Sequence, residues 1–156
     1  MDRSICSVEE LKQTSGRVLG VDFGDTRTGL AVSDPGRFLA SGVGFVSPGG
    51  IVKTADRVAQ IAAEQRVAAV VVGLPRNMDG SVGPRAERCR EFAQLLAERL
   101  PAIPVAMIDE RLTTVSATRY LNETNTRGKA RKTVIDTLSA QIFLQNALDL
   151  LRARDC

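Results

Sequence analysis

Three acidic residues stand where this chain could carry out chemistry. Asp22 lies at the end of an apolar run, two residues before Gly24, Glu110 ends another apolar run, and Asp136 precedes a stripe of apolar residues at helical spacing. Carboxylates held close together repel one another unless a cation lies between them, and Mg²⁺ and Mn²⁺ prefer oxygen ligands. Two such ions can stabilise both sides of an in-line phosphoryl displacement. The three acids therefore predict a two-metal site that hydrolyses phosphodiester bonds, with all three as metal ligands and catalytic residues.

The composition removes the competing chemistries. The chain has no histidine, which excludes Ser-His and Cys-His nucleophile pairs, histidine general bases and histidine metal ligands. It has no Trp and one Tyr, which argues against an aromatic platform for single strands. Four of its five Phe fall in expected helices or strands: Phe23, Phe45, Phe92 and Phe143. The expected strands and helix faces account for the apolar runs, so the sequence gives no indication of a dimer interface.

Each acid also has a structural alternative. Asp22 could cap a hairpin turn, and Glu110 could pair with Arg111 or another surface arginine. Thr133 and Asp136 resemble a capping box at a helix start. The Asp22 turn also resembles the phosphate-binding turns of sugar kinases and actin-like ATPases. Those proteins need two such domains, which 156 residues cannot hold.

Basic residues supply the candidates for substrate binding. The net charge is only +3, but 17 of the 21 basic residues are Arg, which suits bidentate phosphate contacts although codon bias gives the same skew. The densest basic segment, expected as a loop over 126–132, precedes Asp136 and is either a phosphate-binding loop or a solvated one. The residues predicted to bind substrate are Arg27, Arg76, Arg127, Lys129, Arg131 and Lys132, with Arg85 and Arg88 as weaker candidates.

The hydrophobic pattern predicts the elements that must position these residues. Two apolar runs joined by a Gly-rich turn predict a hairpin, and later stretches alternate between helical spacing and short buried runs. Strands are expected over 18–23, 28–33, 42–46, 68–72 and 103–108, and helices over 52–65, 84–100, 114–122 and 133–152. A loop is expected over 73–81. The fold class is therefore α/β, a mixed five-stranded sheet of three antiparallel strands followed by parallel βαβ units, with helices on both faces.

The remaining sequence predicts one domain with an appended segment. Residues 1–16 are polar and are expected to form an N-terminal arm, with a short helix over 8–13, ahead of a nuclease domain over 17–156. No apolar run is long enough to span a membrane and no signal peptide is visible, so we expect a cytoplasmic protein without a membrane partner. The cysteines Cys6, Cys89 and Cys156 form no CxxC pair and predict neither a zinc site nor a disulfide framework.

Several segments together resemble the YqgF or RuvX-like proteins of bacteria. They run in order and at family-like spacing through most of the chain: Gly20-Val21-Asp22-Phe23-Gly24 through Arg27, Gly29, Ala31 and Ser33-Asp34; Val72-Gly73-Leu74-Pro75 with Asp79-Gly80-Ser81; Asp109-Glu110-Arg111-Leu112-Thr113; and Asp136 with Ala140 and Leu144-Gln145. The resemblance implies an RNase H-like fold with the first strand central and a divalent-metal site. It also puts the family's three acids on Asp22, Glu110 and Asp136.

The resemblance implies two nucleic-acid substrates. Proteins of this family look like Holliday-junction resolvases by fold, and they are widely described as nucleases that process the 5′ end of pre-16S ribosomal RNA. A resolvase must cut two strands symmetrically and is expected to act as a dimer, whereas one active site on a monomer suffices for RNA processing. We therefore expect a nuclease using Mg²⁺ or Mn²⁺ on structured RNA precursor rather than on branched DNA, as a monomer or homodimer. The alternative from another class is a catalytically silent nucleic-acid-binding module.

Overall fold

Five strands form one mixed sheet in the computed structural model, which describes residues 8–24, 27–46, 49–74, 83–109 and 128–152, and only the backbone at 8–9, 109, 128–138 and 152. The strands are β1 (Val18–Asp22), β2 (Thr28–Ser33), β3 (Ala40–Val46), β4 (Ala69–Leu74) and β5 (Val105–Asp109). Their order is β3-β2-β1-β4-β5, with β1 at the centre. The first three strands pair antiparallel, and β4 and β5 run parallel to β1. The expected fold class and the central position of the first strand are confirmed.

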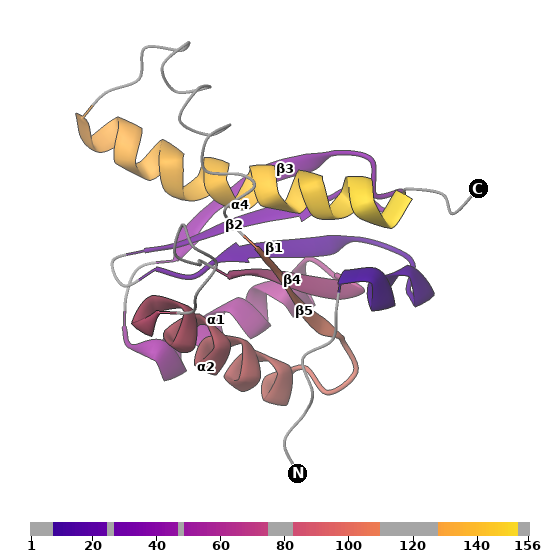
Figure 1. The fold of residues 1–156 in the computed structure, drawn as a ribbon, viewed down its shortest axis with the longest axis horizontal. Helices are drawn as coiled ribbons and strands as arrows, with labels where there is room; N and C mark the ends of the chain where they lie inside the picture. The colour runs from indigo at the N-terminus through magenta and orange to yellow at the C-terminus, as the bar shows by residue number, and fades with distance from the viewer. Residues whose placement is uncertain (1–7, 25–26, 47–48, 75–82, 110–127, 153–156) are drawn as a thin grey trace.

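Helices cover both faces of this sheet (Figure 1). One face carries α1 (Ile51–Glu64) and α2 (Pro84–Arg99), which pack on each other. The opposite face carries α4 (Gly128–Arg152) and a short 3-10 helix, η1 (Val8–Gln13). The positions of α1 and α2 agree with the expected helices within one residue at each end.

Strict alternation along the strands builds a separate hydrophobic core on each face. Leu19 and Val21 of β1 point toward α1 and α2, where they share a cluster with Phe92. Val18 belongs to the other cluster, which includes Phe143 of α4. The buried stripe of α4 is the one that the sequence predicts from Asp136 onward: Ala140, Phe143, Leu144 and Ala147, with Leu151 packed at its edge.

Gly20 lets α4 approach the centre of the sheet closely. A Cβ atom at Gly20 would lie 2.9 Å from the Cβ of Leu144 and 3.3 Å from the carbonyl oxygen of Ala140. Real Cβ atoms essentially never come within 3.0 Å of a neighbour, so the contact with Leu144 leaves no room for a side chain. The glycine therefore fixes where α4 crosses β1.

The last helix begins earlier than the sequence indicates. It starts at Gly128, so Lys129, Arg131 and Lys132 lie in its first turns and the expected basic loop over 126–132 is wrong there. Lys, Ala and Arg are good helix formers, and nothing after Gly128 interrupts them. Asp136 therefore lies two turns inside the helix, and its alternative role in a capping box with Thr133 is also wrong.

Two smaller boundaries differ as well. β3 begins two residues earlier than expected, at Ala40, which pairs with Ser33. The expected loop over 73–81 starts too early, because Gly73 and Leu74 pair with Ile108 and Asp109 and so extend β4. The rest of that loop from residue 75 and the helix expected over 114–122 lie outside the described residues.

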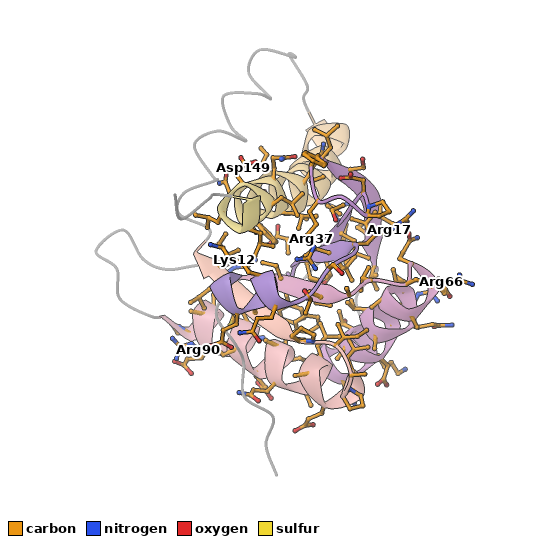
Figure 2. All side chains as sticks on the ribbon, turned by 90° about the vertical axis from the view of Figure 1, so that its right-hand side faces the viewer. Lys12, Arg17, Arg37, Arg66, Arg90 and Asp149 are labelled. Atoms are coloured by element: carbon orange, nitrogen blue, oxygen red, sulfur yellow. The ribbon has the colours of Figure 1, made fainter. Side chains whose placement is uncertain are left out.

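The N-terminal segment is anchored to the domain through a buried arginine. The short helix expected over 8–13 is η1, whose Leu11 is fully buried in the α4-side core. Arg37 donates hydrogen bonds to the carbonyl oxygens of Gly16 (2.7 Å) and Leu11 (3.0 Å), and to Thr14 Oγ1 (2.7 Å). Figure 2 shows Arg37 beside η1. The division between an arm and a nuclease domain stays a prediction.

Among the helices of the described residues, we find none with the length and apolar character needed to cross a membrane.

Candidate active site

Asp22 lies at the carboxyl end of the central strand and is partly exposed. Its neighbours Val21 and Phe23 point into the α1 and α2 side, whereas Gly20 meets α4. Because side chains alternate along a strand, Asp22 belongs to the α4 face. The carboxylate therefore stands at the edge of the α4-side core rather than in it.

The carboxyl ends of the three parallel strands lie at this same end of the sheet. Val21 is paired with Val72, and Leu74 is paired with Asp109, the last residue of β5. Neighbouring strands lie about 4.8 Å apart, so the end of β5 is two strand spacings from β1. Glu110 follows Asp109 directly in the chain but lies outside the described residues.

The direction of α4 carries Asp136 toward this end of the sheet. α4 runs opposite to β1 (Figure 1), and Gly20 lies beneath Ala140 and Leu144. Asp136 precedes Ala140 by about one turn, roughly 6 Å, and Asp22 follows Gly20 by roughly 6.6 Å in the same direction. The Asp136 side chain itself lies outside the description.

Arg27 is the one predicted substrate-binding residue whose side chain is described. Its guanidinium carbon lies 5.5 Å from the ring centroid of Phe45, within cation-π range. Asp22 is paired with Gly29, and Gly29 with Phe45. An acid, an arginine and an aromatic ring are thus brought to one end of the antiparallel strands.

The described part of the structure does not place the side chains of the other residues that we predict to bind substrate. Arg76 and Arg127 lie outside the described residues, and only the backbone of Lys129, Arg131 and Lys132 is described. Their role in substrate binding stays a prediction.

Arg85 approaches the site, although the sequence favours it only weakly. Its Nη2 donates a hydrogen bond to the carbonyl oxygen of Phe23 at 3.3 Å, from the first turn of α2. It also lies 3.8 Å from where a Cβ atom on Gly24 would be. The signal available in the sequence was its place just after Pro84, which begins α2, but only the fold brings this helix start to the end of β1.

The described side chains contribute one acid to the metal site that the sequence predicts. No group of three or more His, Cys, Asp or Glu side chains occurs among the residues that the structure describes. Two members of the predicted set, Glu110 and Asp136, have side chains beyond that description. Asp22 itself fits a hard divalent cation, because it offers carboxylate oxygens at a partly exposed strand end.

Comparison with known proteins identifies close relatives over nearly the whole chain. A protein of Latilactobacillus sakei named putative pre-16S rRNA nuclease is 45% identical over 140 residues, covering 85% of this chain and 92% of its own. A protein of the same name from Cereibacter sphaeroides is 45% identical over 137 residues, covering 88% and 85%. One from Rhodospirillum centenum is 40% identical over 159 residues, covering 97% and 85%.

Solved structures share the fold at low identity. RuvC of Thermus thermophilus in complex with a Holliday junction matches with a TM-score of 0.56 and 16% identity, over 86% of this chain and 94% of that one. The Fowlpox virus resolvase in its junction complex matches with a TM-score of 0.53 and 9% identity, over 88% and 99%. The family model described as RuvX, Holliday junction resolvase, matches residues 16–150. This chain belongs to the RuvX family and has the RNase H-like fold of the RuvC-type resolvases.

Proposed function

We propose that this protein is a metal-dependent nuclease that hydrolyses phosphodiester bonds and processes the 5′ end of pre-16S rRNA. The observation that carries the proposal is the position of Asp22, a partly exposed carboxylate at the end of the central strand where β4 and β5 also end. The names of relatives at 40–45% identity favour the RNA substrate. A role in rRNA processing implies a cytoplasmic protein.

The alternation along β5 supports Glu110 as the second acid. Val105 and Met107 pack on the α1 and α2 side, and Ala106 and Ile108 on the α4 side. If β5 is extended by one residue, Asp109 belongs to the first side and Glu110 to the α4 face, which is the face of Asp22. Asp109 is therefore the natural control for Glu110.

The helical register supports Asp136 as the third acid. Asp136 lies one turn before Ala140, which is buried against the sheet, so both positions fall on the same helix face. With the capping role excluded by the helix start at Gly128, a carboxylate on this face needs another partner. The direction of α4 brings this position toward the end of β1, where Asp22 lies.

Asp22, Glu110 and Asp136 would hold Mg²⁺ or Mn²⁺, as two ions in our proposal. When bound, the ions supply charge stabilisation for the attacking and leaving oxygens of an in-line displacement. The chain itself would orient the substrate: Arg27 binds backbone phosphate beside Asp22, and the basic residues before and within the start of α4 hold the flanking backbone.

The proposal is tested with purified protein on a pre-16S leader RNA and on a four-way DNA junction, with Mg²⁺, with Mn²⁺ or with EDTA. We expect cleavage of the RNA that requires the metal and exceeds paired cleavage of the junction. Glu110→Gln should abolish cleavage, whereas the matched Asp109→Asn should retain most of it. An equal loss of cleavage from both changes would contradict the assignment of Glu110, and not Asp109, to the site.

The same assay decides between the alternatives. Symmetric paired nicking of the junction by a dimer, with RNA left intact, would make the protein a resolvase. Binding without cleavage of either substrate would make it a silent module. The exposed side chains Phe38, Leu39, Val43 and Phe45 at and beside the edge strand β3 contradict the sequence argument that the chain has no spare apolar surface, so that argument no longer disfavours a dimer.

A further inference from the structure

Phe45 is an aromatic side chain at the surface beside the site. The sequence assigns it to a strand, which argues for burial, but β3 is an edge strand and Phe45 is 43% exposed. By comparison, Phe23, Phe92 and Phe143 are at most 5% exposed. Phe45 is therefore available to stack on a planar ligand while Phe23 and Phe92 stack on each other inside.

The strand register puts Phe45 in the same row as Asp22. Asp22 is paired with Gly29, which is paired with Phe45, and directly paired residues of antiparallel strands share a face. Phe45 therefore belongs to the face of Asp22, about two strand spacings, roughly 10 Å, away. Gly29 carries no side chain, so β2 places nothing between the carboxylate and the ring.

A basic pocket lies around the sheet edge from Phe45, on the opposite face, where α1 packs beside β3. It has a volume of about 500 Å³ and is lined by Phe45, Val46, Gly49, Lys53, Thr54, Arg57 and Ile61. Of these described lining residues, two are cationic and none is acidic. Lys53 and Arg57 lie one turn apart on α1 and are exposed. The arrangement of an aromatic ring followed by a basic groove suits a single-stranded nucleic acid, whose bases stack and whose phosphates need cations.

We propose that a single strand extending from the cleaved phosphodiester passes from Asp22 over Phe45 and around the edge strand β3 into this pocket. A base stacks on the Phe45 ring, Arg27 contacts the phosphate beside it, and Lys53 and Arg57 bind phosphates further along. The inference rests on the proposed function, which it deepens by assigning where the strand outside the duplex lies. Charge complementarity identifies the occupant as a polynucleotide.

The test measures binding by fluorescence anisotropy in EDTA, so that cleavage does not interfere. The probes are a labelled RNA duplex with a single-stranded extension of about ten nucleotides, at either end, and the same duplex with blunt ends. Lys53→Ala with Arg57→Ala should lower affinity for the extended probe by about tenfold. It should also reduce the log-log salt slope by about 1.4, at about 0.7 for each phosphate contact. Phe45→Ala should lower affinity by roughly fivefold or more, and Phe45→Trp should restore it.

A matched control removes two positive charges elsewhere. Arg66 follows the far end of α1 and Arg90 lies on α2; both are exposed and lie on opposite sides in the view of Figure 2. Arg66 has a left-handed backbone conformation, with a φ of 54°, which Asn tolerates better than Ala. Asn therefore replaces Arg66, and Ala replaces Arg90. This double variant should bind the extended probe like the wild type.

Three results would overturn the inference. One is a loss of affinity in the control variant equal to that in the pocket variants. Another is an equal loss on the blunt duplex, which would show that the pocket does not bind the extension. The third is a change from dimer to monomer on sizing, with RNA affinity unchanged, which would make this surface an interface between copies of the chain.

The outcomes also separate this inference from the proposed function. If the protein cleaves RNA but the pocket variants bind the extension normally, the pocket assignment fails alone. If it cleaves nothing, yet the pocket variants selectively lose the extension, the nuclease proposal fails and the binding surface stands.

Discussion

The two ends of the sheet are built differently. At the end where β1 begins, the chain satisfies its own polar groups: Ser33 Oγ accepts the Val18 amide at 2.9 Å, and the Ala40 amide donates to Gln145 Oε1 of α4 at 2.9 Å. Arg37 ties η1 to the same end. At the end where β1 stops, Asp22 and Phe45 are partly exposed beside Arg27. The first end holds the fold together, and the second is the end at which we propose that the substrate binds.

The largest expected effect comes from removing the charge at the open end. Asp22→Asn keeps the shape of the side chain but removes the charge of the proposed metal ligand, so the rate of RNA cleavage should fall by about 10³-fold or more. The melting temperature should change little, because Asp22 lies outside both cores. Initial rates and thermal unfolding of the same preparations measure both quantities.

Asp34→Asn is the matched control at the closed end. It makes the same chemical change on a carboxylate that only caps a turn, where Asp34 Oδ1 accepts the amides of Phe38 and Leu39. Its cleavage rate per folded molecule should equal that of the wild type. If Asp34→Asn lost as much of the cleavage rate as Asp22→Asn, the two ends of the sheet would not differ in function as we expect.

The next largest effect concerns the arginine of the closed end. Arg37→Ala removes three hydrogen bonds and leaves buried acceptors without a donor, so the free energy of unfolding should fall by about 3 kcal/mol. Arg37→Gly should cost about 1 kcal/mol less, because Arg37 has a φ of 62° that glycine adopts without strain. Urea unfolding of both variants measures the difference, and identical losses would show that the backbone conformation contributes nothing.

A smaller effect is expected where α4 crosses β1. Gly20→Ala introduces a Cβ 2.9 Å from that of Leu144, so α4 must shift or the core must distort. The expected loss is about 2 kcal/mol in the free energy of unfolding. Urea unfolding checks it, and an unchanged midpoint would show that α4 is not held closely over β1.

The smallest effect is the pH dependence that Asp34 contributes. Hydrogen bonds from the backbone amides, that of Leu39 foremost, lower the pKa of Asp34 below its usual value of 3.8. A lowered folded-state pKa means that the stabilisation is present above about pH 4 and is lost as the pH falls through the folded-state value. The difference in the free energy of unfolding between wild type and Asp34→Asn should therefore shrink as the pH falls from about 5 to about 2. If this difference does not change with pH, the charge of the Asp34 carboxylate does not contribute to stability.

Much of the fold follows from local pattern. The two apolar runs around a Gly-rich turn predict the β1-β2 hairpin, and the spacing from Asp136 to Leu151 predicts the buried face of α4. Both patterns depend on periodicity within one element, which a sequence displays directly. The same periodicity marks Asp22 as the end of a strand.

What the sequence could not predict depends on neighbours in space. Phe45 looks buried because it lies in a strand, but its exposure follows from β3 being at the edge of the sheet. Arg37 lies in a Pro-Gly turn that looks like surface, yet η1 folds over it. The sequence predicts that α4 starts at Thr133, because Thr133 and Asp136 have the pattern of a capping box although they lie inside a longer helix.

Binding of Mn²⁺ tests most directly whether the open end of the sheet is a metal site. Isothermal titration of the wild type with Mn²⁺ should show binding, with about two ions as the proposed two-metal mechanism requires. Asp22→Asn should lose most of that binding, whereas Asp34→Asn should bind Mn²⁺ like the wild type. Undiminished Mn²⁺ binding by Asp22→Asn would contradict the account, because the carboxylate at the end of β1 would then not be a metal ligand.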